Sequence, residues 1–198
     1  TGVQTCALPI SDRIGVIGSS LGAAVGISAA GSDPRFAAVI SSGGWGNGES
    51  KFRRQHASPE AWARFTGMLE QGKTHRARTG APLMVPRFDI VPIPASAGRA
   101  PAADALEEFP SETAQSMFDF RPEELVGRIA PRPLLLLHSA TDPVTPREQS
   151  LALFERAGQP ADLHLFAEGS HYLLAQTNER VWRVVREWLE MYFPLRQG

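Results

Sequence analysis

The sequence predicts an α/β fold, in which helices cover both faces of a mainly parallel β-sheet. Short, unbroken apolar segments alternate with segments of helical periodicity along most of the chain. Unbroken apolar segments are typical of parallel strands buried on both faces, and their alternation with helices is typical of a parallel sheet. Turns that carry serine, aspartate or histidine follow three of these segments, at the edge where such sheets place their sites.

The composition fits one globular domain, because 42% of the 198 residues are hydrophobic and can form a core. The net charge of −1 gives no electrostatic footprint for nucleic acid or an anionic membrane. No apolar run approaches the roughly 20 residues that span a bilayer. We therefore expect no nucleic-acid partner and no membrane span. The oligomeric state and the compartment stay open, with the cytoplasm slightly favoured.

Residues 1–11 resemble the translation of a short-read sequencing adapter, and they fit no element of the predicted fold. We exclude them, as one excludes a cloning scar. The only cysteine, Cys6, falls in this segment, so we expect no disulfide and no thiol chemistry. We expect the authentic protein to begin upstream of Asp12, so that residues 12–198 form a partial domain without its N-terminal strands.

The first strand leads into a sharp turn and a helix. The apolar residues 14–17 end at residues 18–22, which match the pattern G-x-S-x-G, and the small residues 23–30 continue as a helix. The pattern places Ser20 at the tip of a strained strand-to-helix turn, as a candidate nucleophile. The alternative is a glycine- and serine-rich turn without chemistry.

The neighbours of Ser20 suit that role. Gly18 and Gly22 are expected to give room where strand and helix cross, because glycine has no Cβ. The backbone N–H of Leu21 lies at the helix N-terminus, where it can stabilise an oxyanion.

The rest of the chain supplies three further strands around an insertion. A turn at residues 31–34 precedes a strand at 36–42 and a loop at 43–48. We expect a cap-like insertion at about residues 47–124. It contains a helix that starts after Ser58 and stops near Gly72, an irregular stretch at 82–101 and a short helix at 111–118. The pattern then resumes with a strand at 133–138, a capping box at 145–148 with a helix to Ala157, a strand at 162–167 and an amphipathic helix at 178–192.

An acid and a base follow the later strands. Asp142 comes after the strand at 133–138, and His171 after the strand at 162–167. An imidazole can take the proton of a serine hydroxyl, and a carboxylate orients the imidazole and stabilises its cation. Ser20, Asp142 and His171 are therefore predicted to form a catalytic triad.

Each residue of this predicted triad also has an alternative interpretation. Asp142 could be a turn residue before a helix, and His171 a loop histidine. The competing acids Glu148 and Asp162 are better interpreted as a capping partner and a strand-start residue. His138 could line the pocket, although a structural role is favoured, and Trp45 could shape the pocket or simply pack.

No spacing suggests a metal site: H-E-x-x-H, C-x-x-C and clustered carboxylates are absent, and His56, His75 and His164 form no motif. We expect neither a metal nor a cofactor.

The sequence resembles the C-terminal two-thirds of a serine α/β-hydrolase. The resemblance rests on residues 18–22, on residues 141–146 and on Glu168-Gly169-Ser170-His171, and it covers nearly all of the chain after Asp12 apart from the insertion. Residues 128–133 look like esterase, dienelactone-hydrolase and acyl-peptidase-like members. The resemblance implies a nucleophile elbow at Ser20, with Asp142 as acid and His171 as base. The strand whose loop supplies the second oxyanion donor in that family is missing here.

These observations predict a serine hydrolase that cleaves small-molecule carboxylic esters through an acyl-enzyme. One alternative is a peptide or amide hydrolase of the prolyl-oligopeptidase-like type. Another is a binding domain of the same fold without catalytic activity.

Overall fold

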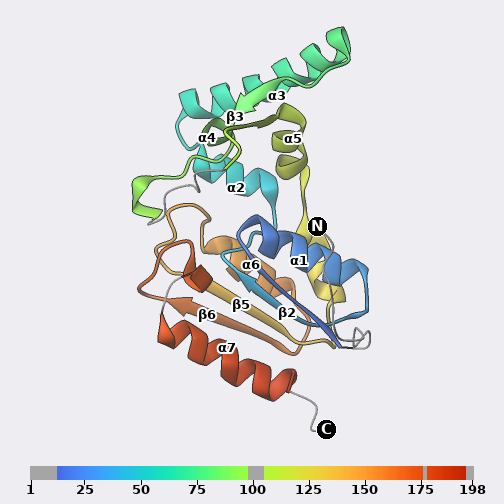
Figure 1. Cartoon of the computed structure of the whole chain (residues 1–198), viewed down its shortest axis with the longest axis vertical. Coiled ribbons are helices and arrows are strands. Elements are labelled where there is room, and N and C mark those ends of the chain that lie inside the picture. Colours follow the sequence, from blue (N-terminus) through green and yellow to red (C-terminus); the bar gives the residue numbers. More distant parts are fainter. Residues whose placement is uncertain (1–12, 98–104, 176–177, 195–198) are drawn as a thin grey trace.

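The structure of the chain, a computed structural model, describes residues 13–97, 105–175 and 178–194 (Figure 1). The segment 1–11, predicted from the sequence to be adapter-derived, and its Cys6 lie outside the described residues. The same holds for residues 98–101 of the stretch predicted as irregular.

Four strands form the central sheet, in the order β1-β2-β5-β6, and every neighbouring pair is parallel. The strands are β1 (Ile14–Ser19), β2 (Phe36–Ser42), β5 (Leu134–Ser139) and β6 (Ala161–Phe166). Each of the later three lies within one residue of its predicted position. Because parallel strands end at one edge of the sheet, the turns after β1, β5 and β6 lie at that edge.

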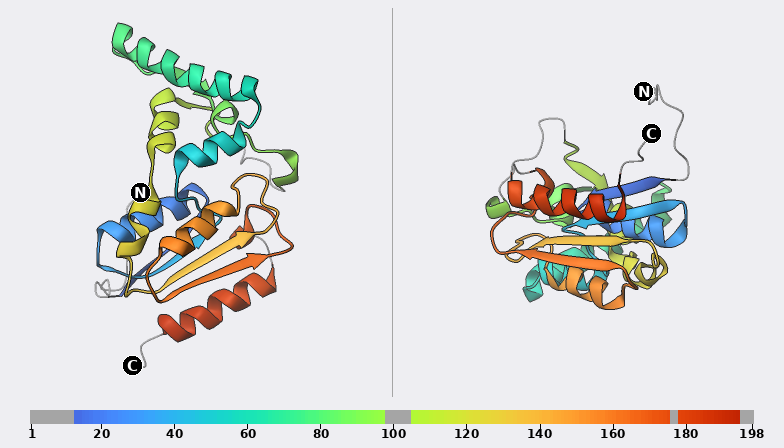
Figure 2. Two further views of the ribbon diagram at one scale, coloured as in Figure 1. Left: turned by 180° about the vertical axis from the view of Figure 1, so that it is seen from behind. Right: turned by 90° about the horizontal axis from the view of Figure 1, so that it is seen from below.

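Helices cover both faces of the sheet (Figure 2). The helices α1 (Leu21–Ser32) and α6 (Glu148–Arg156) pack on one face, and α7 (Glu179–Tyr192) packs on the other. The leucines of β5 alternate between the two core layers: Leu134 and Leu136 join the α1 side, whereas Leu135 and Leu137 join the α7 side. A strand buried on both faces needs no polar positions, which explains the unbroken apolar run. The predicted fold class is confirmed.

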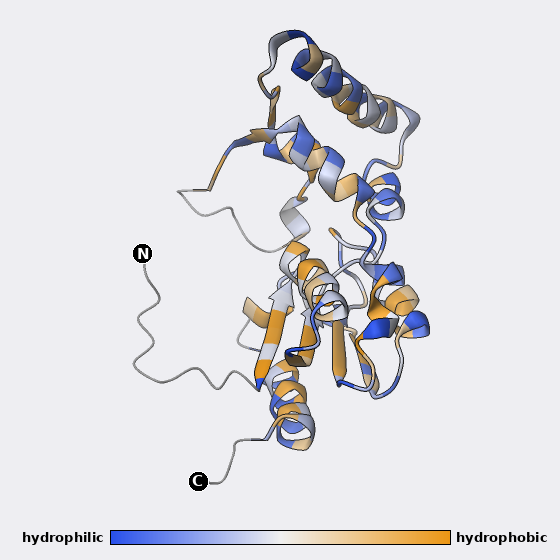
Figure 3. Cartoon of the chain, turned by 90° about the vertical axis from the view of Figure 1, so that its right-hand side faces the viewer, coloured by the Kyte–Doolittle hydropathy of each residue, from blue (hydrophilic) through white to orange (hydrophobic). Residues whose placement is uncertain are grey.

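Among the described residues, β1 is the edge strand nearest α1 and pairs with β2 alone. Its Ile14 and Ile17 are 40% and 52% exposed, and Val25 of α1 is 49% exposed. The strands of the sheet are largely coloured as hydrophobic in Figure 3. An open strand edge with apolar neighbours favours pairing with another chain.

The insertion lies beyond one end of the sheet and has a core of its own (Figure 1). Its aromatic and aliphatic side chains, among them Phe52, Phe65 and Ile90, form a cluster separate from the two layers of the sheet. The elements are α2 (Gly48–Gln55), α3 (Pro59–Thr79), β3 (Met84–Pro86), α4 (Arg87–Ile90), the 3-10 turn Ala95–Ala97, β4 (Glu108–Pro110) and α5 (Ser111–Asp119). Two further 3-10 turns, Pro122–Glu124 and Val126–Arg128, lead back to β5.

Three expectations for the insertion need correction. The helix predicted to stop near Gly72 continues to Thr79 and ends at Gly80, which has a left-handed φ of 73°. Gly72 serves close packing instead, because a Cβ there would meet the side chain of Ser111 on α5. The stretch predicted as irregular contains β3, which pairs with β4 in an antiparallel ribbon, and the helix α2 was not predicted at all.

The capping box predicted at residues 145–148 is wrong. The helix α6 begins at Glu148, and the Thr145 hydroxyl has no hydrogen-bond partner among the described residues. The backbone of Thr145 serves the preceding loop instead: its N–H donates to Asp142 Oδ1 at 2.9 Å, and its carbonyl lies 2.9 Å from His138 Nε2. These two contacts hold Thr145 outside the helix.

In the described part of the chain, no helix is both long enough and apolar enough to cross a membrane.

Candidate active site

Ser20 occupies a strained turn between β1 and α1. Its φ of 56° and ψ of −121° make it the only described non-glycine residue with a positive φ. Such a conformation costs about 1–3 kcal/mol and persists only where the surroundings enforce it. Here the N–H of Ser20 donates to Ser42 O at 2.9 Å, and its carbonyl accepts from Ala23 N and Ala24 N of α1. The backbone thus has the geometry that the G-x-S-x-G pattern predicts.

The two glycines of the pattern differ. A Cβ on Gly18 would collide with the backbone carbonyl of Gly22 and lie 2.6 Å from Ala23 N, so this position has no room for a side chain. A Cβ on Gly22 would meet no described atom within 4 Å. The expectation that Gly22 also provides room is therefore wrong, because its Cβ side faces open space at the edge of the sheet.

Leu21 begins α1, directly after Ser20. A backbone N–H in the first turn of a helix has no acceptor within the helix, and the helix dipole favours negative charge there. The backbone N–H of Leu21 therefore lies where the sequence predicts an oxyanion donor.

Asp142 and His171 form a hydrogen-bonded pair. Asp142 Oδ2 lies 2.7 Å from His171 Nδ1, and the side chains of both residues are at most 2% exposed. The other oxygen, Oδ1, accepts the N–H groups of Val144 at 2.8 Å and Thr145 at 2.9 Å. Burial works against the charged form of Asp142, but hydrogen bonds from His138, His171 and Thr145 outweigh it and hold the pKa of the carboxyl well below its usual range. The carboxylate therefore stays charged and fixed.

His138 contacts the same carboxylate oxygen as His171. It is fully buried, with Nδ1 2.6 Å from Ser150 Oγ and Nε2 2.9 Å from Thr145 O. A carbonyl only accepts, so Nε2 carries the hydrogen, and this nitrogen also lies 3.4 Å from Asp142 Oδ2. His138 does not line the cavity described below, so the structural interpretation favoured from the sequence agrees with its position.

Replacing His138 with phenylalanine is expected to lower the free energy of unfolding by about 2 kcal/mol or more, because Thr145 O and Ser150 Oγ lose a buried partner. Urea unfolding of the variant measures this loss. His164→Phe, at an exposed position of β6, is the matched control and should change stability far less. Equal stability of the two variants would contradict the assignment.

One cavity joins Ser20 and His171. It has a volume of about 290 Å³, and its walls come from both the sheet edge and the insertion. Most of the other lining side chains are apolar: Leu21, Trp45, Ile90, Val91, Ile93, Phe109, Met117, Val144 and Tyr172. Trp45, for which the sequence allowed packing or pocket formation, is fully buried and lines this cavity.

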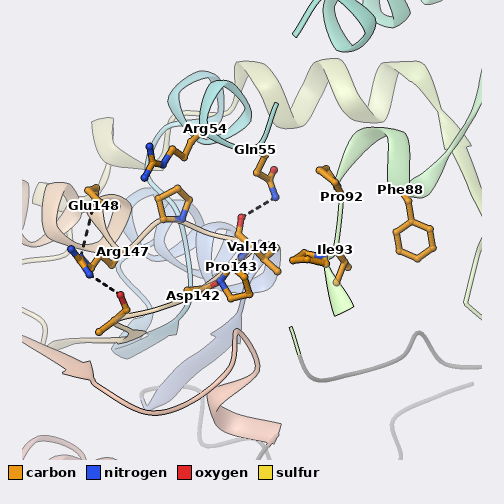
Figure 4. A pocket seen from close by; sticks show the side chains of 13 residues that line it. Arg54, Gln55, Phe88, Pro92, Ile93, Asp142, Pro143, Val144, Arg147 and Glu148 are labelled. Atoms are coloured by element: carbon orange, nitrogen blue, oxygen red, sulfur yellow. Dashed lines mark hydrogen bonds and ion pairs between the residues drawn. The ribbon is translucent and has the colours of Figure 1, made fainter. Parts of the chain in front are cut away.

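A larger hollow of about 600 Å³ is lined by Asp142 and the residues that follow it, together with residues of the insertion (Figure 4). Arg54, Gln55, Phe88 and Arg147 line it, but neither Ser20 nor His171 does. Because Ser20 and His171 both line the smaller cavity, that cavity is the candidate site.

The structure thus brings Asp142 and His171 into contact, and Ser20 lines the same cavity as His171. The competing acids lie elsewhere: Glu148 pairs with Arg147 at 3.6 Å, and Asp162 lies in β6. Within the described residues, no group of three or more His, Cys, Asp or Glu side chains could hold a metal ion. Sequence reasoning missed Lys51, a buried cation that also lines the cavity.

A parallel sheet with a strained serine after one strand and an Asp–His pair after two others defines the class of α/β hydrolases. The sequence model of the alpha/beta hydrolase family matches residues 3–184, and the chain belongs to this family. A search of the curated proteins found no match.

Solved structures show the same fold. The alpha/beta hydrolase GrgF from Penicillium sp. sh18 is 16% identical with a TM-score of 0.68, over 93% of this chain and 65% of that chain. The monoacylglycerol lipase of Paleococcus ferrophilus is 22% identical with a TM-score of 0.67, over 91% and 69%. Acetyl xylan esterase 1 from Thermoanaerobacterium sp. JW/SL YS485 is 16% identical with a TM-score of 0.54, over 93% and 47%. The chain thus spans about two thirds or less of the length of the structures that it resembles.

Proposed function

We propose that the protein is a serine hydrolase that cleaves carboxylic esters through an acyl-enzyme. The observation that carries this proposal is the 2.7 Å hydrogen bond between Asp142 and His171, beside a serine held in a strained turn. The three groups follow three parallel strands, and the cavity that contains Ser20 and His171 leaves space for a small acyl group. Family membership, and structural neighbours that include a lipase and an esterase, agree with this reaction class.

The hydrogen bond to Asp142 sets the tautomer of His171. With Nδ1–H donating to the carboxylate, Nε2 keeps its lone pair and can accept a proton. Nε2 takes the proton of the Ser20 hydroxyl while Oγ forms a bond to the ester carbonyl carbon. The N–H of Leu21 donates to the resulting oxyanion. The described residues show no hydrogen bond between Ser20 and His171, and such bonds often tighten only when substrate binds.

The intermediate then collapses. The bond between the carbonyl carbon and the alcohol oxygen breaks, and the proton on His171 Nε2 goes to the leaving alkoxide. Water attacks the acyl-enzyme by the same route, with His171 as base, and releases the carboxylic acid and free Ser20. No cofactor is needed in this sequence of steps. We propose that the insertion acts as a cap, because Ile90, Phe109 and Met117 close the cavity from its side.

Labelling with a fluorophosphonate tests the nucleophile directly. We expect a covalent adduct on Ser20 of the full chain, located by mass spectrometry of the peptides, because only an activated serine displaces fluoride rapidly. Ser20→Ala should remove the adduct. The matched control is Ser19→Ala, since Ser19 lines the same cavity and should not be labelled.

The other outcomes are equally specific. A folded chain without any adduct would overturn the proposal and favour a binding domain of this fold. If Ser20 were labelled and the protein hydrolysed peptidyl amides but no short-chain esters, the triad would stand. The proposed substrate would then be an amide instead of an ester.

A further inference from the structure

One buried cation lines the candidate cavity and has no part in the chemistry above. Lys51 lies on α2 of the insertion and is 2% exposed. It lines the same cavity as Ser20 and His171. Lysine is almost never buried without a partner, because its ammonium group loses its water.

The surroundings of Lys51 satisfy only part of its hydrogen-bonding capacity. Its Nζ donates to Gln55 Oε1 at 2.6 Å, and the amide of Gln55 is held by a second bond from Nε2 to Val144 O at 2.9 Å (Figure 4). The aromatic rings of Phe52 and Trp45 lie 4.1 and 5.5 Å from Nζ. An ammonium has three donors, and among the described residues only Gln55 accepts from it.

The charges around the cavity have one sign. Arg87 of α4 lines it as a second cation, and no described lining residue is acidic. The charge of Asp142 acts on Lys51, but His138 and His171 already contact this carboxylate. The indole N–H of Trp45 also lacks an acceptor among the described residues. The cavity thus offers donors and positive charge without a matching anion.

Burial lowers the pKa of Lys51 to about 7, because the desolvated ammonium is disfavoured, while the charge of Asp142 opposes this effect in part. The protein's own groups therefore stabilise the charged form of Lys51 only in part. An anion beside the Lys51 ammonium would replace the stabilisation that this group loses when it is removed from water.

We propose that the ester hydrolysed at this site carries a free carboxylate, which Lys51 binds within the cavity while Ser20 attacks the ester carbonyl. This inference rests on the proposed function for its reaction and adds the substrate class: half-esters of small dicarboxylic acids. Lys51 supplies a charged hydrogen bond from Nζ, Arg87 adds a second positive charge, and the apolar side chains hold the intervening methylene groups.

A matched pair of substrates tests this preference. Monomethyl glutarate is an anionic half-ester, and its carboxamide analogue has nearly the same shape without charge. We expect kcat/KM of the full chain to be at least about tenfold higher for the anionic ester, since only the anionic ester forms a hydrogen bond between two charged groups with Lys51. Lys51→Met should reduce this ratio to about one.

Two variants complete the design. Lys73→Met changes the other lysine of the chain, which is exposed on α3 and pairs with Glu70, and it should leave the ratio as it is. Arg87→Gln, at a half-buried position, should lower the ratio by a smaller factor and keeps the test available if Lys51→Met does not fold. A wild-type ratio near one, or the same ratio in Lys51→Met, overturns the inference.

The pH dependence gives a second signature. Only the ammonium form of Lys51 attracts the carboxylate, so the ratio should be highest below pH 7 and fall as the pH rises above that value. Both esters meet the same remaining groups, so the effects of those groups cancel in the ratio. The titratable and charged groups around Lys51 are His56, Arg87, Asp142, His171 and Tyr172. In Lys51→Met the ratio should not change with pH.

Binding separates this inference from the proposed reaction. Calorimetric titration of monomethyl glutarate into Ser20→Ala needs no turnover, and we expect at least about tenfold tighter binding than to Ser20→Ala/Lys51→Met. Tight, Lys51-dependent binding in a chain that hydrolyses neither ester would sustain the anion site and remove the hydrolase proposal. Ester hydrolysis without Lys51-dependent binding would support the hydrolase proposal and rule out the anion site.

Discussion

Asp142→Asn is expected to lower kcat for ester hydrolysis by roughly 10³–10⁴-fold. The asparagine amide can still accept the N–H groups of Val144 and Thr145 through its oxygen, so the loop should keep its shape. Its nitrogen would then face His171 Nδ1 and donate to it, which moves the ring hydrogen to Nε2. His171 could no longer accept the proton of Ser20, and the charge that stabilises its cation would be gone.

Steady-state kinetics with a short-chain ester measures this effect, and circular dichroism checks that the variant is folded. Asp162→Asn and Glu148→Gln are the controls, because the sequence offers both as alternative acids and neither lies against His171. If Asp142→Asn kept more than about a tenth of the wild-type kcat, His171 would not depend on Asp142, and the assignment would have to move to another acid.

Gly18→Val is expected to lower the free energy of unfolding by about 3 kcal/mol or more and to abolish activity. A Cβ on Gly18 would overlap the carbonyl group of Gly22 and approach Ala23 N, and backbone atoms cannot move aside as a flexible side chain can. The first turn of α1 would have to shift away from β1. Since Ser20 takes its conformation from this crossing, its hydroxyl would leave the position from which it reaches a substrate.

The matched control is Gly22→Ala in the same turn. No described atom lies within 4 Å of the new methyl group, and alanine favours the helix, so stability should stay within about 1 kcal/mol of wild type or improve. Thermal and urea unfolding of the two variants provide the comparison. Equal losses at both positions would show that the turn does not depend on the close approach at Gly18.

Residues whose role depends on local sequence could be predicted. The apolar run Leu134–Leu137 predicts a strand buried on both faces. In the structure these leucines alternate between the two core layers. Ser20, Asp142 and His171 each follow a strand, and a parallel sheet brings such positions to one edge whatever the chain does in between. The pairing of Asp142 with His171 therefore needed no knowledge of the insertion.

The insertion could not be predicted in the same way, because distant contacts decide its structure. The helix α2 has a mostly polar sequence, and Lys51 becomes buried only because this helix docks beside Trp45 and Val144. The strands β3 and β4 are three residues each, too short for an alternating pattern. The same limit explains Gly22: the pattern G-x-S-x-G does not reveal which of its glycines meets a neighbour.

The position of the insertion in the chain bears on the order of folding. The strands β1 and β2 are joined through α1 alone, whereas Val39 of β2 pairs with Leu134 of β5 about 95 residues later in the sequence. Closing so long a connection costs more chain entropy and slows folding. We expect the unit β1–α1–β2 to form early, and β5 to dock after the insertion has collapsed onto its own core. During folding, the turn that holds Ser20 would thus exist before its acid and base arrive, and catalytic competence would come with the last strands.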